Sequence, residues 1–528
     1  MVNAFLDFFR LARAGLTLVW HGVHVVPEGV PAPLPARLLR RASGPFRRAE
    51  VGTGQASKLS KALTTLGPSY IKLGQFLATR RDVIGPALAD DLARLQDRLP
   101  PFSMAEARRA IRDTLGAEPE QLYASLSEPL AAASIAQVHK GTVRDADGSL
   151  RTVAVKILRP GVEAGFRRDL SSFYFAARQA ERWHPPSRRL RPVAVVDTLA
   201  EWVRLEMDLR LEAAAMSEMA ENIAKAGDTG FRVPKVDWQR TSARVLTSAW
   251  IDAIPMGDIA AIDAAGIDRE ALGNHVIRSF LRHAMRDGFF HADMHQGNLF
   301  VQPDGTLVAV DFGIMGRLGP KEKRFLAEIL YGFISRDYRR TAQMHLDAGY
   351  VPAHHSVEAF AQALRAIGEP LMDRTAEEIS MARLLSQLFE VTELFDMRTR
   401  PELLLLQKTM VVVEGVARSL DPRLNIWTAA EPVVKAWIEG QIGPRARIAE
   451  AVDGVSALAG LIAEAPRLAE QARRVSTALA ESAESGLRLD QSTVERMAAA
   501  QSARSWPGRM ALWAGAIALA AIAVKFWS

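Results

Sequence analysis

The chain has 528 residues, of which 48% are hydrophobic and 24% charged, so it exceeds one ordinary domain and has a globular composition. It contains no cysteine, which excludes disulfides, thiol catalysis and cysteine-ligated metals and fits a reducing compartment. The formal net charge is +6, but basic and acidic residues are interleaved, and the sequence has no zinc knuckle and no basic stripe with aromatic residues. We therefore expect no nucleic-acid partner.

Residues 1–50 are predicted to form an amphipathic, membrane-facing segment. Within residues 1–20, Arg10 and Arg13 lie among apolar side chains, which does not match the charged start and apolar core of a signal peptide. A helix here could lie on a membrane surface or pack on the domain, and both interpretations remain open. The basic stretch 37–48 would meet anionic lipid headgroups or form a solvated basic linker.

Residues 51–128 are predicted to form a helical extension ahead of the main domain. The extension contains the sequence Lys72-Leu73-Gly74-Gln75, in the pattern K-x-G-Q. On the residues alone, Lys72 is interpreted as a solvated lysine on a helix.

Residues 129–254 are predicted to form a small lobe built on a hairpin. Two strand-like runs, 136–143 and 151–158, flank the turn 145–148, and the second run contains the sequence VAVKI with Lys156. Protein kinases carry V-A-I-K on such a strand, where the lysine holds the α and β phosphates of the nucleotide. We therefore predict that Lys156 anchors phosphates and is not a solvated edge residue.

An acidic partner for this lysine is expected on a following helix. Residues 199–221 have helical periodicity and carry Glu206, Asp208 and Glu212. In one continuous helix, Glu206 and Glu212 would be about 240° apart, so they could not both meet Lys156 from one face. We assign Glu212 to Lys156, and Glu206 with Asp208 to a second role in cofactor binding. The alternative is a solvated acidic face.

The phosphate loop departs from the kinase pattern. Where a kinase has G-x-G-x-x-G, this chain has AAASIA at residues 131–136. Glycine permits positive φ and close approach to phosphates, whereas the Cβ of alanine hinders both. A nucleotide contacting Ala133, Ser134 and Ala136 would be held differently, which favours an atypical member over an ordinary protein kinase.

Three acidic and amide residues predict the catalytic half of the site. Asn298 follows Asp293 by five positions, as in the kinase pattern H-R-D-x-x-x-x-N, and Asp311 opens an Asp-Phe-Gly sequence. Asp293 would orient a water or an acceptor hydroxyl, while Asn298 and Asp311 would hold Mg²⁺ against the nucleotide phosphates. The alternative is that all three only cap turns and helices.

A predicted hairpin supports the catalytic assignment. Apolar runs at 299–301 and 307–310 flank the turn 303–305, so the residues just before and just after the hairpin should face one cleft. His291 and His295 are interpreted as structural hydrogen-bonding residues, because two histidines are too few for a metal site.

Residues 255–430 are predicted to form a mainly helical large lobe after a hinge at 250–255. The Asp-Phe-Gly sequence leads quickly into a predicted helix at 320–333, and no A-P-E sequence follows. Little room remains for a peptide-binding activation segment, so the sequence argues against a peptide substrate.

Residues 431–505 are predicted to form a helical stalk or linker, and residues 506–528 a transmembrane tail. The uncharged run 510–524 has 15 residues. As a helix it spans about 22 Å, against a hydrocarbon core of about 30 Å, so a packed or membrane-associated helix is the alternative. Arg504 and Arg509 precede it, which by the positive-inside rule keeps the large domain cytoplasmic. The stalk could also form a lipid-facing surface or a homodimer interface.

These features together resemble the UbiB family of protein-kinase-like proteins, which support ubiquinone biosynthesis. The resemblance runs from about residue 60 to about residue 425. The residues that carry it are 72–75, 131–139, Lys156, Glu206, Asp208, Glu212, 291–298, 311–313 and the stretch 401–422 with Lys408 and Glu414. The K-x-G-Q sequence combined with the alanine-rich run is highly specific to this family.

The resemblance implies an α+β, two-lobed protein-kinase-like fold with an N-terminal helical extension, to which the sequence adds a C-terminal transmembrane helix. In this family the extension folds over the cleft and obstructs a protein substrate, so Lys72 and Gln75 are carried over as active-site residues. Family members resemble ATPases more than protein kinases, and they are tied to membranes that hold lipid quinone intermediates.

We therefore expect a membrane-anchored atypical kinase or ATPase that uses ATP (or ADP) and Mg²⁺ and supports ubiquinone biosynthesis. A small-molecule or lipid kinase and a nucleotide-gated lipid-binding scaffold for quinone precursors are the alternatives. The expected partners are inner-membrane lipids, quinone precursors and other ubiquinone-biosynthesis proteins. The expected location is the bacterial inner membrane, with the catalytic domain on the cytoplasmic side.

Overall fold

The computed structural model describes residues 2–21, 58–78, 99–183, 191–372 and 401–442, with single residues and short stretches between them. The chain divides into two compact units, Met1–Ile438 and Glu439–Ser528. Apart from residues 439–442, the described residues all lie in the first unit.

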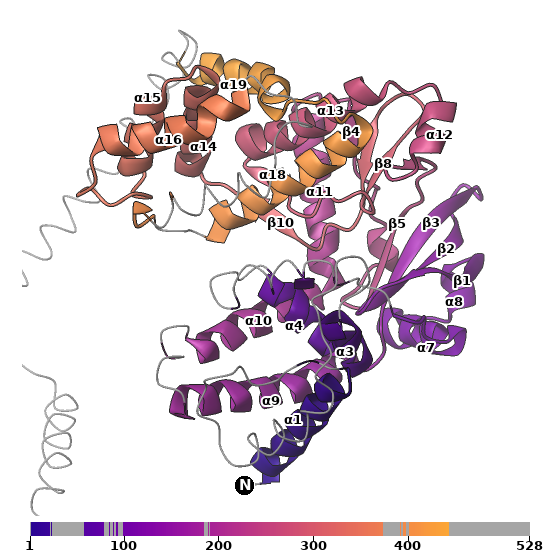
Figure 1. Cartoon of the computed structure of the whole chain (residues 1–528). Coiled ribbons are helices and arrows are strands. Elements are labelled where there is room, and N and C mark those ends of the chain that lie inside the picture. Colours follow the sequence, from indigo (N-terminus) through magenta and orange to yellow (C-terminus); the bar gives the residue numbers. More distant parts are fainter. Residues whose placement is uncertain are drawn as a thin grey trace, which may run out of the picture. The chain divides into compact units, whose positions relative to one another are not determined.

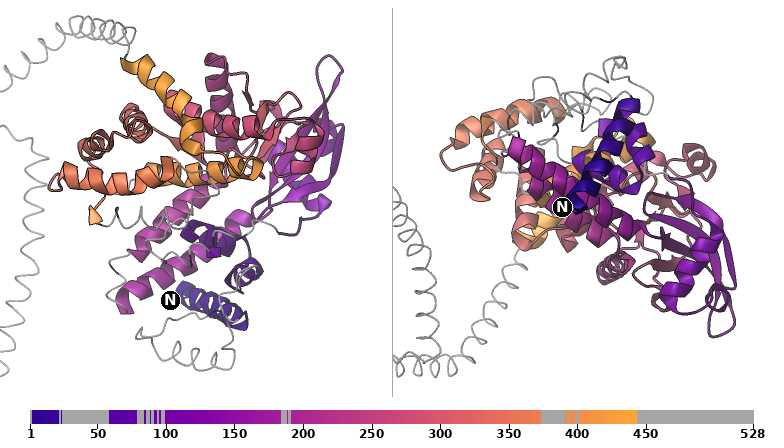
Figure 2. Two further views of the ribbon diagram at one scale, coloured as in Figure 1. Left: turned by 45° about the horizontal axis from the view of Figure 1, so that its top comes forward. Right: turned by 90° about the horizontal axis from the view of Figure 1, so that it is seen from below.

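The N-terminal helices pack against one another and against helices of the small lobe. Helix α1 (Val2–Trp20) lies along α9 (Val162–Trp183) and contacts α3 (Lys58–Leu66) (Figure 1; Figure 2). Helix α4 (Pro68–Ala78) contacts α3, α9 and α10 (Pro192–Glu206). The extension is therefore built into the small lobe and does not form a separate domain within the described residues.

Helix α1 confirms the predicted N-terminal helix, and it packs on the domain. The buried carboxylate of Asp7 accepts hydrogen bonds from the hydroxyls of Ser171 (2.7 Å) and Ser172 (3.1 Å) on α9. Packing covers only part of the apolar surface of the helix, and the exposed large apolar residues are Leu6, Phe8, Phe9, Leu16 and Trp20. Contact of this exposed surface with a membrane stays a prediction.

The small lobe contains a four-stranded antiparallel sheet in the order β1-β2-β3-β5. Its strands are β1 (Ser125–Ala132), β2 (Ala136–Arg144), β3 (Leu150–Leu158) and β5 (Val245–Ala249). The predicted hairpin is confirmed as β2 and β3. Val153, Val155 and Ile157 are buried against α7 (Met104–Leu115), beside the short α8 (Pro119–Leu122). Because strand side chains alternate between faces, Lys156 lies on the opposite face.

The single helix predicted for residues 199–221 is wrong. The chain forms α10 up to Glu206 and a separate α11 (Leu209–Lys225). The break has a local cause, since the Asp208 side chain accepts a hydrogen bond from the Arg210 N–H (3.1 Å) and caps the new helix. Apolar periodicity continues across the break and conceals it in the sequence. Glu206 and Glu212 therefore belong to different helices.

A 3₁₀ turn at Trp238–Arg240 packs on β5 of the small lobe, and the large lobe contains two small sheets. One sheet has the order β4-β9-β8-β6, with β4 (Phe231–Arg232), β9 (Leu307–Ala309), β8 (Leu299–Val301) and β6 (Ile254–Pro255). The other pairs β7 (Phe289–His291) with β10 (Met315–Arg317). The antiparallel pair β8 and β9 confirms the hairpin predicted around residues 303–305.

Helices form most of the remaining large lobe, as predicted. Their bounds are α12 (Ile259–Ala264), α13 (Arg269–Arg282) with a π-helical turn at His283–Asp287, α14 (Pro320–Ile334), α15 (Tyr338–Asp347), α16 (Val357–Met372), α18 (Pro401–Leu420) and α19 (Ile426–Ile442). Helix α14 confirms the helix predicted directly after the Asp-Phe-Gly sequence. One hydrophobic core cluster joins the extension to both lobes and includes Ile71, Met216 and Phe280.

Several predicted segments lie outside the described residues. They are the basic stretch 37–48, residues 443–505 of the predicted stalk, and the predicted transmembrane tail 506–528. Among the helices that the structure describes, none has the length and apolar character needed to cross a bilayer. The α+β kinase-like part of the predicted fold is present.

Candidate active site

A largely buried lysine shared by two carboxylates forms the centre of the site. Lys156 lies on β3, and its Nζ donates hydrogen bonds to both carboxylate oxygens of Glu212, each at 2.9 Å. The same Nζ is 3.2 Å from Oδ1 of Asp311. Glu212 is in the first turn of α11 and on its buried face, so the helix aims this carboxylate at the strand. The predicted pairing of Lys156 with Glu212 is therefore present.

The charges of this cluster do not balance. Loss of hydration opposes the charge on Lys156, but Asp311 and Glu212 outweigh it and raise the pKa of the lysine. Burial raises the pKa of Glu212 to about 7, opposed by Lys156 and assisted by the charge of Asp311. Loss of hydration works against ionisation of Asp311, whose side chain is half exposed, yet Lys156 lowers the pKa of that carboxyl to about 2. Once Glu212 is ionised, above about pH 7, one cation serving two carboxylates leaves an excess of negative charge.

Asn298 and Asp311 lie at the two ends of the β8–β9 hairpin. The Val310 N–H donates to the carbonyl of Asn298 (2.9 Å), which brings Asp311, the next residue, close to Asn298. The amide nitrogen of Asn298 donates to the carbonyl of Asp293 (3.1 Å), so its amide oxygen is left for a ligand. Asp311 has a φ of 60°, in the left-handed region that non-glycine residues rarely occupy.

These residues fit a magnesium-bound nucleotide. A carboxylate and an amide oxygen are donors that Mg²⁺ accepts, and a divalent cation beside Asp311 would offset the excess negative charge. Glu206 adds a buried carboxylate oxygen, Oε2, with no hydrogen-bond partner among the described residues. Such an oxygen can accept from a water or hydroxyl of a bound ligand.

The catalytic loop is held by a buried histidine. The Asp293 N–H donates to Nδ1 of His291 (3.1 Å), and Nε2 of His291 is hydrogen-bonded to the carbonyl of Val310 (3.1 Å). Burial lowers the pKa of His291, so it stays neutral with the proton on Nε2. His291 therefore ties the loop that bears Asp293 to the strand that leads to Asp311, as expected of a structural histidine.

His295 makes a second contact with the same loop. Its Nδ1 accepts from the Gly297 N–H (3.0 Å), and its Nε2 is 3.5 Å from Oδ2 of Asp293. The Asp293 side chain is partly exposed. The predicted structural role of His295 is thus present in its backbone contact, and a contact with the Asp293 carboxylate comes in addition.

Lys72 is buried, so its interpretation as a solvated lysine is wrong. Its Nζ pairs with the carboxylate of Glu206, and it lies 5.7 Å from the centre of the Trp202 ring. The charge of Lys72 also helps to lower the pKa of Asp311. The extension therefore supplies a cation to the same electrostatic environment as Lys156. Gln75 lies on the same helix, partly buried.

The glycine of the K-x-G-Q sequence is required for packing. A Cβ on Gly74 would lie 2.8 Å from Cδ1 of Leu63 and 2.8 Å from Cδ2 of Leu95. Glycine at this position lets α4 lie close to the ends of the Leu63 and Leu95 side chains, and a Cβ here would require those side chains to move.

Asp208 has a different environment from Glu206. Besides capping α11, its carboxylate forms a two-pronged ion pair with the guanidinium of Arg210, at 2.9 and 2.7 Å. Both carboxylate oxygens of Asp208 are therefore engaged within the protein. Its predicted role in cofactor binding stays a prediction.

The alanine-rich loop is a tight hairpin braced by an arginine. The Ala133 N–H donates to the carbonyl of Ala136 (2.8 Å). Arg159 donates to the carbonyls of Ser134 (3.3 Å), Ala133 (3.3 Å) and Pro100 (2.9 Å). Ser134 and Ala136 are buried, so contact with a nucleotide through this loop stays a prediction. Sequence reasoning missed Arg159, which follows the β3 strand and has no motif of its own.

Family models match two parts of the chain. An ABC1 atypical kinase-like domain matches residues 94–345, and a UbiB helical domain matches residues 364–425. Relatives named "Probable protein kinase UbiB" occur in Aeromonas salmonicida, with 38% identity over 83% of this chain and 81% of the relative, and in Marinobacter nauticus, with 39% identity over 74% and 71%. The chain belongs to the UbiB family.

A solved structure of Rv3197 in complex with erythromycin, from Mycobacterium tuberculosis, also matches. Its TM-score is 0.49 with 24% sequence identity, and the match covers 76% of this chain and 97% of that one.

The UbiB helical domain supplies residues that sequence reasoning did not assign to the site. From α18, Nζ of Lys408 is 3.9 Å from Oδ1 of Asp293, and the hydroxyl of Thr409 donates to the carbonyl of Ala292 (3.1 Å). The amide of Gln296 donates to the hydroxyl of Ser419 (2.6 Å). The UbiB resemblance included Lys408 but gave it no role. No local pattern could have assigned one, because its partner lies 115 positions earlier in the sequence.

Proposed function

We propose that this UbiB-family chain is an ATP- and Mg²⁺-dependent atypical kinase or ATPase that supports ubiquinone biosynthesis at a membrane. The observation that carries the proposal is Lys156 placed between Glu212 and Asp311. An ammonium held in this way is a binding group for nucleotide phosphates, and the second carboxylate is a ligand for a divalent cation. The atypical-kinase family match supports the same reading.

Each residue has a distinct task in this proposal. Glu212 fixes the ammonium of Lys156 for the α and β phosphates. Bound Mg²⁺, held by Asp311 and Asn298, would neutralise phosphate charge. Asp293 orients a water or an acceptor hydroxyl toward the terminal phosphate, and Lys408 offers a positive charge beside that carboxylate. The missing A-P-E sequence, and the extension that places Lys72 beside Glu206, favour water or a small acceptor over a peptide.

The membrane and quinone parts of the proposal have separate support. The relatives carry the UbiB name, and helix α1 exposes large apolar side chains, among them Phe9 and Trp20, on its outer surface. We assign the chain to the bacterial inner membrane, with lipids and quinone precursors as partners. A nucleotide-gated lipid-binding scaffold would use the same surface and the same nucleotide site.

The decisive experiment measures Mg²⁺-dependent ATP hydrolysis by the full chain, with and without anionic liposomes and a phenolic analogue of the quinone head. Asp311→Asn is expected to lower kcat by about 100-fold or more. The matched control is Asp304→Asn, the same change at an exposed position in the β8–β9 turn, and it should retain activity. Equal hydrolysis by Asp311→Asn and the wild type would refute the assignment. Tight nucleotide binding without turnover would favour the scaffold.

A further inference from the structure

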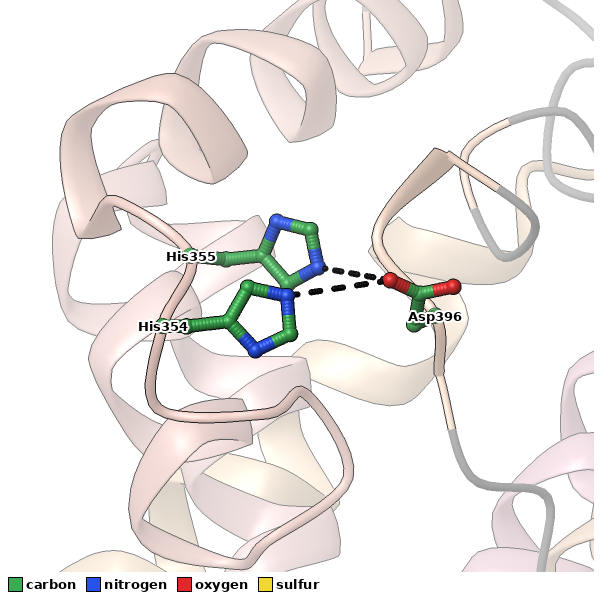
Figure 3. Close-up of side chains that lie close together, drawn as sticks. All are labelled: His354, His355 and Asp396. Atoms are coloured by element: carbon green, nitrogen blue, oxygen red, sulfur yellow. Dashed lines mark hydrogen bonds and ion pairs between the residues drawn. The ribbon is translucent and has the colours of Figure 1, made fainter.

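Two histidines and one aspartate converge in the helical region, away from the residues assigned to catalysis. His354 and His355 are consecutive residues between α15 and α16, and Asp396 precedes α18 in the sequence (Figure 3). Nε2 of His355 is 3.2 Å and Nε2 of His354 is 3.8 Å from the same carboxylate oxygen, Oδ2 of Asp396. Figure 3 shows both rings directed at that oxygen from one side.

The spacing of these atoms suits a small transition-metal ion. Zinc binds histidine nitrogen and carboxylate oxygen at about 2.0–2.2 Å in tetrahedral geometry, so neighbouring ligand atoms are about 3.3 Å apart. The two observed distances, 3.2 and 3.8 Å, bracket that value, and all three ligand atoms lie within 4.8 Å of one another. The side chain of His354 is exposed, so its ring has room to rotate toward a shared ion.

The chemistry of the donors selects the class of ion. Two imidazole nitrogens with one carboxylate oxygen suit Zn²⁺, whereas Mg²⁺ and Ca²⁺ prefer sites made of oxygen ligands. Three protein ligands also leave a fourth position for water, as in zinc sites that are open to solvent. His354 and Asp396 both have side chains that are 68% exposed, so an ion can reach the cluster from solution.

The cluster rests on a small hydrophobic core that orders it. The His355 ring is 5.3 Å from the ring of Phe395, and Phe395 packs 4.8 Å from the buried Phe360 of α16. Asp396 itself has a φ of 48°, a left-handed conformation that aspartate and asparagine tolerate better than other residues. The packing below and the backbone conformation therefore fix the carboxylate close to the imidazoles.

We propose that His354, His355 and Asp396 form a zinc-binding site. The bound ion would join the connection between α15 and α16 to the segment ahead of α18, two stretches that are 41 residues apart in the sequence. None of the three residues belongs to the proposed nucleotide site, so the two sites can be tested separately.

The first test is a titration of the full chain, free of any histidine tag, with ZnCl₂ in an isothermal calorimeter. One zinc per chain is expected, with a rise in Tm as zinc is added, because a ligand that binds only the folded state stabilises it. Asp396→Asn should weaken zinc binding by at least about 10-fold. Asparagine keeps the left-handed backbone and the side-chain shape, so this variant should fold.

Two controls separate the proposed site from other sources of zinc binding. Glu358→Gln removes one exposed negative charge nearby, in the first turn of α16, and should bind zinc like the wild type. Asp311→Asn should also retain the binding, whereas zinc held at the nucleotide site would be lost in that variant. His354→Gln provides a second test in an exposed side chain and should match Asp396→Asn.

Two outcomes would overturn the proposal. One is a wild-type chain that binds no zinc even at zinc concentrations well above the dissociation constants of ordinary zinc sites. The three residues would then form only a hydrogen-bonded cluster. The other is unchanged zinc affinity and unchanged zinc-dependent Tm in both Asp396→Asn and His354→Gln. Loss of binding in these two variants, with retention in Glu358→Gln and Asp311→Asn, would establish the site.

Discussion

Two largely buried lysine–glutamate pairs lie near the proposed nucleotide site, and they differ in their surroundings. Lys156 and Glu212 join β3 to α11, and Asp311 provides a second carboxylate for the same lysine. Lys72 and Glu206 join α4 of the extension to the end of α10, with the Trp202 ring beside the lysine. The first group carries an excess negative charge that a divalent cation can offset, whereas the second pair is neutral in itself.

This difference indicates that the Lys156 group serves catalysis, whereas the Lys72–Glu206 pair holds the extension in place. A cluster that gains from a cation is suited to bind one, and it has to be held in place by its neighbours. A neutral pair between two helices gains nothing from a cation, but it fixes the extension against the small lobe. We therefore expect loss of Lys156 to affect turnover most, and loss of Lys72 to affect stability most.

The largest expected effect comes from Lys156→Met. We expect kcat for Mg²⁺-dependent ATP hydrolysis to fall by about 100-fold or more, because the phosphates lose their ammonium and two carboxylates lose their partner. Lys140→Met is the matched control, since this exposed lysine lies on the adjacent strand β2. A kcat of Lys156→Met within twofold of the wild type would contradict the catalytic role of the Lys156 group.

The second prediction concerns pH and Glu212. Its pKa is raised from 4.5 to about 7 in the folded protein, so the folded state keeps a proton that the unfolded chain has already released. The stability that this proton provides is complete below pH 4.5 and is lost as pH rises to about 7. In the absence of nucleotide, the free energy of unfolding of the wild type should therefore fall over this pH range by up to about 3 kcal/mol more than that of Glu212→Gln.

Urea unfolding at pH 4.5 and pH 7.5 measures this difference. Glu221→Gln, an exposed change on the same helix, should show no such dependence on pH relative to the wild type. The interpretation fails when the stability difference between wild type and Glu212→Gln is equal at the two pH values.

The third prediction tests the neutral pair. Lys72→Met leaves the carboxylate of Glu206 buried without its cation, and we expect the free energy of unfolding to fall by about 2 kcal/mol. Adding Glu206→Gln should restore part of that loss, since the unpaired charge is then removed as well. Lys61→Met, an exposed lysine on α3, serves as the control. If Lys72→Met instead lowers turnover as far as Lys156→Met does and leaves stability unchanged, Lys72 serves catalysis and not packing.

The smallest effect is expected from Gly74→Ala. The new Cβ would meet the ends of the Leu63 and Leu95 side chains at 2.8 Å, so α4 has to shift slightly. We expect a loss of about 1 kcal/mol in the free energy of unfolding, because the two leucines can adjust their side chains. Thermal unfolding measures this loss. Gly165→Ala is the control, because a Cβ there would meet only one side-chain atom, at 3.9 Å. Equal Tm values for the two variants would show that α4 packs more loosely than described.

The sequence predicted those parts of the site that local patterns encode. Lys156 lies on an alternating strand, and Asp293, Asn298 and Asp311 follow fixed spacings around one hairpin, so short-range geometry brings them together. The assignment of Glu212 to Lys156 agrees with the structure although its basis, one continuous helix, does not. The break arises because the side chain of Asp208 caps a new helix, which the apolar periodicity does not reveal.

The parts that could not be predicted depend on contacts between distant segments. Only the family resemblance pointed to Lys72 as a site residue, and nothing in the sequence near it indicates Glu206 as a partner. Arg159 reaches the carbonyls of the alanine-rich loop from beyond β3, and Lys408 reaches Asp293 from α18. Periodicity describes one element at a time, so it cannot state which elements meet.

The long separation of Lys72 and Glu206 has a consequence during protein synthesis. The two residues are 134 positions apart, so at a rate of about 5–20 residues per second Lys72 is made roughly 7–27 s before Glu206. Until then, the apolar face of α4 around Ile71 lacks α10, one of the helices that α4 contacts in the folded chain. The nascent extension therefore carries uncovered apolar surface until α10 has been made, and slower translation lengthens that exposure.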